Sequence, residues 1–427
     1  MPGVADETVE ARFAAAMDRI AGQDAPPLGL AVSGGGDSVA LMHLAHRRGG
    51  TLRVATVDHG LRASAAAEAE TVARAADALG LPHHTIRWHW DGAGNLQAAA
   101  RDARRTLLQA WAARHRLGGI LLGHTLDDQA ETLLLNLARG SGVEGLSGMT
   151  EGRVGQTAFL RPLLGHRRAD LRDWLRAEGI GWTDDPTNED ERFDRVRARR
   201  AIAALGFEPV RLAATAGRMS RAREALERRA LDLARRFVRP ALPGDVVLDR
   251  AGLLAIDEDT LRRILSSALR CVAGAAYRPS EAGMGRLLDA IADETSRTLM
   301  GCVIRATLNE ILIHREVAAV EADRTPPSGP WDGAWRAANA PEGTELRALG
   351  AAGLMRIASH PEGMGEEGGA VLGGLPDGYP RAALAAKPAL WRDRDLLGFA
   401  PLGWGVPHAL RWTPPGGPFP DCLLTGR

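Results

Sequence analysis

The chain has 427 residues, of which 45% are hydrophobic and 25% are charged, and its formal net charge at pH 7 is zero. This is the composition of a soluble globular protein, and at about 150 residues per domain it predicts two or three domains. The sequence has no run of about 18 apolar residues and no basic leader, which argues against a membrane span and a secretory signal and makes the cytoplasm the expected compartment.

Short apolar runs alternate with helical patterns in the first part of the chain. Strands are predicted over residues 28–32, 52–57, 83–90 and 120–122, and helices over 39–47, 65–79, 97–115 and 124–138. This alternation predicts an α/β fold, a Rossmann-like parallel sheet with helices on both faces. Ligands of such sheets bind beyond the carboxyl ends of the strands. The loops after Val32, Val57 and Leu122 are therefore expected to meet at one edge.

The rest of the chain has longer helices and more loops. A short strand is predicted near 159–164, a helix over 167–178 and a long helix over 215–236. Three parts are expected: an N-terminal domain over 1–212, a mostly helical domain over 213–316 and a small α+β domain over 317–427. The segment 161–240 has 19 arginines against 13 acidic residues. This excess of positive charge indicates either a surface that contacts phosphates or a helical face exposed to solvent, and charge alone does not decide between the two.

A glycine-rich loop, Ser33-Gly34-Gly35-Gly36-Asp37-Ser38, follows the first predicted strand. Glycines let backbone amides turn towards a ligand, and the N-terminus of the next helix favours an anion by up to about 1–2 kcal/mol. The only lysine, Lys387, lies far along the chain, so this is not the lysine-containing P-loop. Asp37 would repel a phosphate unless it binds a bridging metal. The alternative is a plain glycine turn with Asp37 as the helix cap.

The Ser-Gly-Gly-x-Asp-Ser pattern of this loop resembles the PP-loop of the N-type ATP pyrophosphatases. The resemblance implies an enzyme that cleaves ATP between the α and β phosphates and adenylates an oxygen of its substrate. It implies ATP contacts at Ser33, Gly34, Gly35, Gly36, Asp37 and Ser38. Mg²⁺ is the expected metal, with Asp37 and Asp128 as ligands.

A second motif follows the fourth predicted strand and runs from Gly123 to Thr132, Gly-His-Thr-Leu-Asp-Asp-Gln-Ala-Glu-Thr. Thr125 can cap a helix, and on that helix His124, Asp128 and Glu131 would share one face. The opposite face would be a buried apolar stripe of Leu126, Ala130, Leu133 and Leu137. Two acids that face a phosphate loop suit Mg²⁺ or a substrate ammonium. A solvated acidic face is the alternative.

This second motif and the Arg139-Gly140-Ser141-Gly142 stretch after it closely resemble the tRNA(Ile)-lysidine synthases. Other stretches that fit the family are Val57 to Arg62, Ala100 to Arg104, Arg161 to Leu164, Asp185 to Asn188 and Phe193 to Arg199. The match runs to about Glu316 and is firmest before Arg200. Two positions depart from it: Val196 stands where the family usually has Asn, and Arg105 stands where Tyr is common.

The resemblance implies a two-step reaction on an isoleucine tRNA with a CAU anticodon. The C2 oxygen of the wobble cytidine attacks the α-phosphate of ATP, and free lysine then attacks C2 through its amine as AMP leaves. The implied catalytic residues are Asp37, Asp128, Glu131, His124 and Arg104, with His124 or a carboxylate as the base for the amine. ATP would also contact His59. The tRNA would be held by Arg101, Arg195 and Arg199.

Three other interpretations stay open. A thiolating PP-loop tRNA enzyme would generally need a cysteine pair or an iron–sulfur cluster, whereas Cys271, Cys302 and Cys422 are scattered, which also argues against disulfides or zinc. An ammonia-using synthetase would usually carry a glutaminase domain. A non-catalytic tRNA-binding protein with a relic loop would not turn over ATP. The assembly state is also open, with a homodimer as one alternative.

Overall fold

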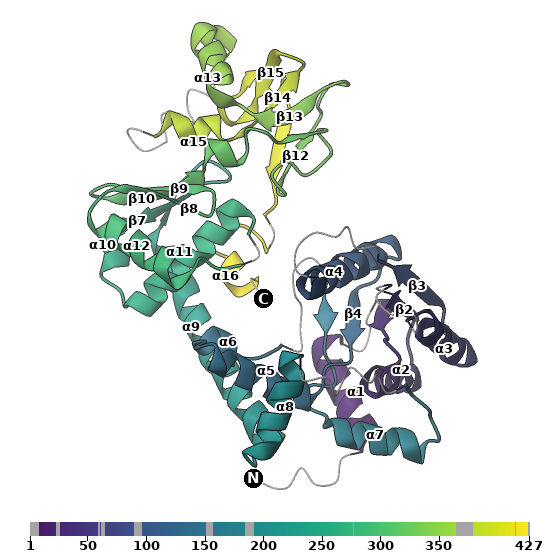
Figure 1. Cartoon of the computed structure of the whole chain (residues 1–427). Coiled ribbons are helices and arrows are strands. Elements are labelled where there is room, and N and C mark those ends of the chain that lie inside the picture. Colours follow the sequence, from purple (N-terminus) through teal and green to yellow (C-terminus); the bar gives the residue numbers. More distant parts are fainter. Residues whose placement is uncertain are drawn as a thin grey trace. The chain divides into compact units, whose positions relative to one another are not determined.

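The chain forms two compact units, Met1–Glu224 and Ala225–Arg427 (Figure 1). The structure is a computed structural model, and it describes residues 8–22, 26–58, 60, 65–88, 96–150, 157–183, 192–275, 277–363, 379–414 and 416–425. Among these residues no helix is both long enough and apolar enough to cross a membrane.

The N-terminal unit is built around a five-stranded sheet in the order β3-β2-β1-β4-β5. Its strands are β1 Leu28–Ala31, β2 Leu52–Asp58, β3 His83–Arg87, β4 Gly119–Leu122 and β5 Phe159–Leu160. All neighbouring pairs are parallel, which confirms the predicted α/β class. Because β1 lies between β2 and β4, the loops that follow β1 and β4 leave neighbouring strands at the same edge.

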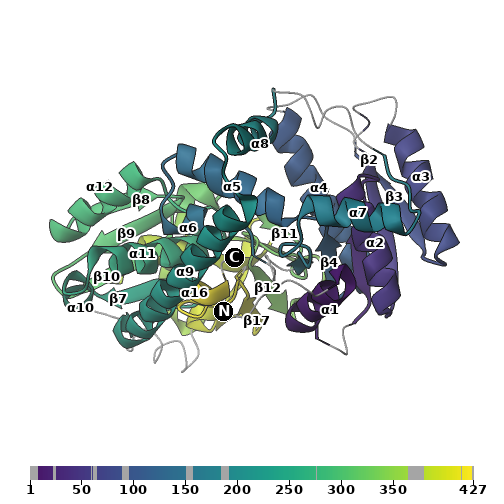
Figure 2. The same ribbon diagram turned by 90° about the horizontal axis from the view of Figure 1, so that it is seen from below.

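Helices cover both faces of this sheet (Figures 1 and 2). In chain order, the first helices described are α1 Val9–Ile20, α2 Gly36–Arg48, α3 Ala65–Ala78, α4 Leu96–Arg114, α5 Leu126–Ala138, α6 Val143–Leu146, α7 Arg168–Ala177 and α8 Asp194–Ala204. Apolar side chains of α1, α2, α3 and α7 share one core with the sheet, and α4 packs on the other face. Gly29 lets α4 come close, because a Cβ there would lie 2.4 Å from Cζ3 of Trp111.

Trp111 also packs against two histidines near the edge strand β3. The ring centroids of His84 and His115 are 4.6 Å apart, and the centroid of His84 lies 6.1 Å from that of Trp111. Burial lowers the pKa of His84 below its ordinary value, and the positive charges of His115, Arg53 and Arg114 act in the same direction. The folded chain therefore resists protonation at this position.

We expect the N-terminal unit to lose stability in mild acid. A histidine with a lowered pKa in the folded state is protonated first in the unfolded chain, so the free energy of unfolding falls as the pH drops below about 6.5. Urea unfolding at about pH 7.5 and about pH 5.5 measures this fall. The variant His84→Phe keeps a ring and should make this fall smaller by the contribution of His84, whereas an unchanged pH dependence in that variant would exclude His84 as a source.

The C-terminal unit begins within the long helix α9 Pro209–Phe237, which starts earlier than predicted because proline suits the first turn of a helix. Its first sheet is antiparallel, in the order β6-β7-β10-β9-β8. The strands are β6 Val238–Arg239, β7 Val246–Asp249, β8 Ser296–Leu299, β9 Cys302–Ala306 and β10 Glu310–Arg315, and the helices are α10 Arg250–Leu254, α11 Glu258–Ala273 and α12 Glu281–Ala292. The predicted helical region is confirmed, and the structure adds a sheet to it.

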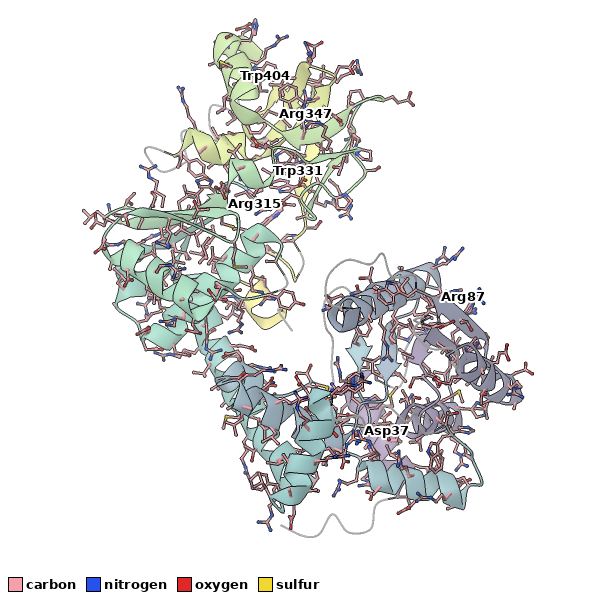
Figure 3. The ribbon with its side chains drawn as sticks, viewed as in Figure 1. Asp37, Arg87, Arg315, Trp331, Arg347 and Trp404 are labelled. Atoms are coloured by element: carbon pink, nitrogen blue, oxygen red, sulfur yellow. The ribbon has the colours of Figure 1, made fainter. Side chains whose placement is uncertain are left out.

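The residues after 316 form the predicted small α+β region. Its main sheet has the order β11-β13-β14-β15-β16, and β12 pairs with β17. The strands are β11 Arg324–Thr325, β12 Trp335–Ala338, β13 Glu345–Ala348, β14 Pro388–Arg392, β15 Asp395–Phe399, β16 Trp404–Gly405 and β17 Ala409–Trp412. The helices are α13 Gly350–Ser359 and α15 Arg381–Ala385, with short turns of 3-10 helix at Val317–Ala319, Pro361–Gly363 and Ala400–Leu402. The last helix, α16 Cys422–Thr425, packs instead on α11 in the core of the first sheet. Trp331 and Trp404 are buried here (Figure 3). The finer division at residues 212 and 316 stays a prediction.

Candidate active site

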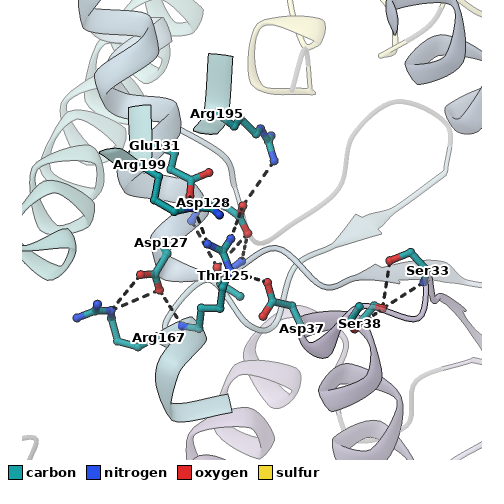
Figure 4. A network of polar contacts seen from close by, with 12 residues as sticks. Ser33, Asp37, Ser38, Thr125, Asp127, Asp128, Glu131, Arg167, Arg195 and Arg199 are labelled. Atoms are coloured by element: carbon teal, nitrogen blue, oxygen red, sulfur yellow. Dashed lines mark hydrogen bonds and ion pairs between the residues drawn. The ribbon is translucent and has the colours of Figure 1, made fainter. Parts of the chain in front are cut away.

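The glycine-rich loop connects β1 to the first turn of α2. Gly34 has a φ of 92°, a conformation that glycine adopts without strain. The hydroxyl of Ser38 closes the loop: its Oγ donates to the carbonyl of Gly35 at 2.8 Å and accepts from the N–H of Ser33 at 3.1 Å (Figure 4). The cap of α2 is Gly35, which makes no side-chain hydrogen bond. The side chain of Asp37 is therefore not used as a cap.

Gly123 brings the second motif against this loop. A Cβ at Gly123 would lie 3.1 Å from Cα of Ser38 and 3.2 Å from the carbonyl oxygen of Asp37. Both are backbone atoms, which cannot rotate away as a side chain can. Glycine thus lets the end of β4 touch the first turn of α2, and the two motifs lie against each other at one edge of the sheet.

We expect Gly123→Ala to lower the free energy of unfolding by about 1–3 kcal/mol, because the added methyl group must push the first turn of α2. The matched control is Gly142→Ala, since a Cβ at Gly142 would meet nothing within 4 Å. Thermal unfolding of both variants gives the comparison. Equal stability of the two would show that the close approach at Gly123 is not required.

Helix α5 begins at Leu126, after a capping box formed by Thr125 and Asp128. The N–H of Thr125 donates to Oδ2 of Asp128 at 2.8 Å, and the N–H of Asp128 donates to Oγ1 of Thr125 at 3.4 Å. His124 therefore precedes the helix, and the prediction that it shares a helical face with the two acids is wrong. The Thr-x-x-Asp spacing that causes this is a known start signal for helices.

Three carboxylates gather opposite the loop. Asp128 and Glu131 of α5 are buried, and Asp37 is half-buried. One guanidinium, that of Arg168 at the start of α7, contacts all three: its Nε lies 2.9 Å from Oδ2 of Asp37, its Nη2 lies 3.1 Å from Oδ1 of Asp128, and its Nη1 lies 3.3 Å from Oε1 of Glu131. The structure thus joins the three predicted catalytic acids through one cation.

The electrostatics of this cluster favour the ionised forms of Asp128 and Arg168. Burial by itself would lower the pKa of Arg168, but the three carboxylates raise it above its ordinary value. Burial would likewise raise the pKa of Asp128, but Arg168 and the N–H of Thr125 hold it below its usual range. Burial keeps the pKa of Asp37 raised, although Arg168 opposes this.

Two further arginines come from α8. The Nε of Arg199 lies 2.9 Å from Oε1 of Glu131, and the Nη1 of Arg195 lies 3.5 Å from Oδ1 of Asp128 (Figure 4). Acids and arginines therefore meet in one place. Such a site can hold a cation through its carboxylates and phosphates through its guanidinium groups.

His124 lies near these charges. Burial lowers its pKa to about 3, and Arg161, Arg195 and Arg104 act in the same direction, against the opposite effect of Asp128. The imidazole is therefore neutral at pH 7, and its Nδ1 has no hydrogen-bond partner among the described residues. Arg104, whose side chain is exposed, thus belongs to the surroundings of the site.

Some predicted residues lie beyond what the structure describes. His59 lies outside the described residues, and so does the stretch from Asp185 to Asn188. The backbone of Arg101 lies in α4, but its side chain is outside the described part.

Arg168 and the contact beside it were not predicted from the sequence. Nε of Arg167 lies 3.3 Å from both carboxylate oxygens of Asp127, and the N–H of Arg168 donates to Asp127 at 2.7 Å. These contacts join α7 to α5. A signal was present, because two arginines at the start of a helix oppose the helix dipole and need acidic partners.

The carboxylate cluster has oxygen atoms that are available to a further cation. Among the described residues, Oδ1 of Asp37 and Oε2 of Glu131 are buried without a hydrogen-bond partner. Mg²⁺ is usually held by one or two carboxylates together with phosphates and water. No group of three His, Cys, Asp or Glu side chains suited to a metal occurs in the described part of the chain. A magnesium ion at this cluster would therefore need oxygen ligands beyond the protein, such as phosphates or water.

Comparison with known proteins first gives the class of this fold and site. Residues 5–205 match the family described as the PP-loop domain, so the loop and its sheet belong to the PP-loop ATP-binding class.

Close relatives then give the family. The chain is 46% identical over 397 residues to the tRNA(Ile)-lysidine synthase of Ruegeria pomeroyi, across 89% of this chain and 91% of the relative. It is 42% identical to the synthases of the same name from Methylobacterium nodulans, across 74% and 95% of the two chains, and from Bradyrhizobium diazoefficiens, across 67% and 84%. The chain belongs to the tRNA(Ile)-lysidine synthase family and is a ligase.

Proposed function

We propose that the chain joins free lysine to C2 of the wobble cytidine of an isoleucine tRNA with a CAU anticodon, at the expense of ATP, in the cytoplasm. The observation that supports this is the gathering of Asp37, Asp128 and Glu131 with three arginines beside the glycine-rich loop. Phosphates and an amino-acid ammonium need groups of opposite charge close together. The named activity of the relatives agrees with this requirement.

In the first step, the residues Ser33 to Ser38 and the N-terminus of α2 hold the phosphates of ATP, with His59 as a further contact. The C2 oxygen of the cytidine forms a bond to the α-phosphorus, and pyrophosphate leaves with the electron pair of the broken bond. Arg104 stabilises the charge that develops there. Mg²⁺, held by Asp37 and Asp128, would add positive charge at the phosphates.

In the second step, the carboxylates of Asp128 and Glu131 hold the ammonium of lysine. The attacking amine of the lysine molecule forms a bond to C2 of the cytidine, and AMP leaves with the former C2 oxygen. The amine must lose a proton, and neutral His124 has an acceptor nitrogen for it. A carboxylate of the cluster is the other candidate base.

The tRNA is held, in this proposal, by Arg101, Arg195 and Arg199. We assign ATP chemistry to residues 1–212, tRNA binding to residues 213–316 and a further role to residues 317–427.

We also propose a homodimer, which light scattering distinguishes from a monomer. Exposed apolar side chains at the turn between α8 and α9, such as Leu205 and Phe207, support a contact surface there.

The order of the two steps is tested with ATP that carries its label in the α-phosphate. When lysine is omitted, the label should appear on the tRNA, and added lysine should release it as AMP. ATP cleavage that never labels the tRNA would contradict the proposal and favour another PP-loop substrate. No ATP turnover at all would favour the relic-loop binding protein.

Thiolation is the nearest alternative, and the thiols argue against it. Cys271, Cys302 and Cys422 are buried, and all three belong to the C-terminal unit rather than to the unit that contains the loop. Burial raises the pKa of Cys302 to about 12, which is typical of an inert thiol.

A further inference from the structure

Arg168 occupies a position in which a cationic ligand would be expected. Each of its three guanidinium nitrogens contacts a different carboxylate, at 2.9 Å for Asp37, 3.1 Å for Asp128 and 3.3 Å for Glu131. Its side chain is 18% exposed, whereas those of Arg195 and Arg199 are 44% and 43% exposed. Arg168 is therefore the cation most closely enclosed by the cluster.

Three carboxylates this close together repel one another unless a cation balances them. Arg195 contacts one of them and Arg199 another, so Arg168 is the group that bridges all three. Even so, Oδ1 of Asp37 and Oε2 of Glu131 are buried without a partner among the described residues. The cluster thus offers acceptor atoms to a second cation while Arg168 already balances the charge of the same carboxylates.

We propose that Arg168 is a positioning residue that stands in for a cationic ligand and releases at least one carboxylate when that ligand binds. This inference rests on the proposed function, which brings two cations to the site, Mg²⁺ and the ammonium of lysine. A cation that must replace Arg168 binds with an affinity reduced by the fraction of molecules in which Arg168 holds the carboxylates. The released guanidinium can then pair with a phosphate of ATP, for which its planar fork is suited.

The test compares Arg168→Met with its matched control, Arg167→Met. The neighbouring Arg167 pairs with Asp127, outside the three-carboxylate cluster. Calorimetry measures the binding of Mn²⁺ alone and of free lysine alone to each full-length protein. We expect at least one of these ligands to bind Arg168→Met about tenfold more tightly than wild type, and Arg167→Met to bind both as wild type does.

The sign of the effect separates this proposal from a structural role. Loss of a structural residue would weaken binding, whereas loss of a stand-in strengthens it. Tighter Mn²⁺ binding alone would assign Arg168 to the place of the metal, and tighter lysine binding alone would assign it to the place of the amino acid. Unchanged or weaker binding of both ligands would overturn the proposal.

Arg168→Lys keeps the test decisive if Arg168→Met does not fold. A lysine retains the charge but lacks the fork that reaches several carboxylates. We therefore expect Arg168→Lys to bind Mn²⁺ or lysine more tightly than wild type does, but less tightly than a protein in which no side-chain cation holds the three carboxylates. Wild-type affinity for both ligands in Arg168→Lys, when Arg168→Met is unfolded, would overturn the proposal. These measurements use neither tRNA nor turnover. A failure of lysine transfer to tRNA would therefore count against the proposed function alone.

Discussion

Asp37→Ala is expected to leave the fold intact and to reduce adenylation of the tRNA about 10²–10³-fold, the loss typical of removing one electrostatic contributor. The fold should survive because Gly35 caps α2 and Ser38 closes the loop, so neither depends on the Asp37 side chain. Pyrophosphate release in the presence of tRNA and ATP, without lysine, measures the first step. Circular dichroism of the variant checks the fold.

Asp127→Ala is the matched control for this variant. Asp127 is also an acid near the cluster, but it bonds to Arg167 and to the backbone of Arg168 rather than facing the loop. We expect its loss to affect stability more than the rate of adenylation. Near-wild-type pyrophosphate release by Asp37→Ala would contradict the role given to Asp37.

Glu131→Gln is expected to separate the two steps of the reaction. Glu131 is buried, with Arg168 and Arg199 on one oxygen and no partner on the other among the described residues. Because a charge-assisted contact is worth about 1.5–3 kcal/mol, kcat/KM for lysine should fall roughly 10- to 100-fold. Adenylation, which does not use lysine, should fall much less.

Transfer of labelled lysine and release of pyrophosphate, measured on the same preparation, give the two rates for Glu131→Gln. Equal losses in both would show that Glu131 acts on the ATP chemistry or on the fold rather than on lysine. A rise in KM for lysine, with little change in kcat, would place Glu131 in binding of the amino acid.

The parallel sheet and the glycine-rich loop were predictable because both depend on local pattern. Apolar runs that alternate with helical periods are short-range signals, and Ser33 to Ser38 is contiguous in the sequence. The meeting of the loops after β1 and β4 followed from a general rule about parallel sheets. These parts of the prediction needed no knowledge of long-range contacts.

The role of Arg168 was not predictable in the same way. Its contact with Asp37 joins residues that are 131 positions apart, and no periodic pattern records such a pairing. The predicted stripe on α5 also failed in part, because Ala130 and Leu133 are buried whereas Leu137 is 58% exposed. A helical period identifies the apolar side of a helix, but it does not show where the neighbouring structure ends.

The antiparallel sheet of the C-terminal unit was missed because its strands are short and lie between strongly helical segments. The turn between β8 and β9 is a tight two-residue hairpin, in which Met300 and Gly301 have φ values of 56° and 66°, and such hairpins usually carry a sequence signal. Met at the first of these positions hides that signal, because glycine or asparagine is the usual residue there.

The most direct test of the central claim is transfer of labelled lysine to an isoleucine tRNA with a CAU anticodon, in the presence of ATP and Mg²⁺. One control omits ATP, and another replaces the wobble cytidine with uridine. We expect label on the tRNA that depends on both ATP and the cytidine. Label that persists without ATP, or equal labelling of the uridine variant, or no label while ATP is still cleaved, would contradict a lysine ligase acting on that cytidine.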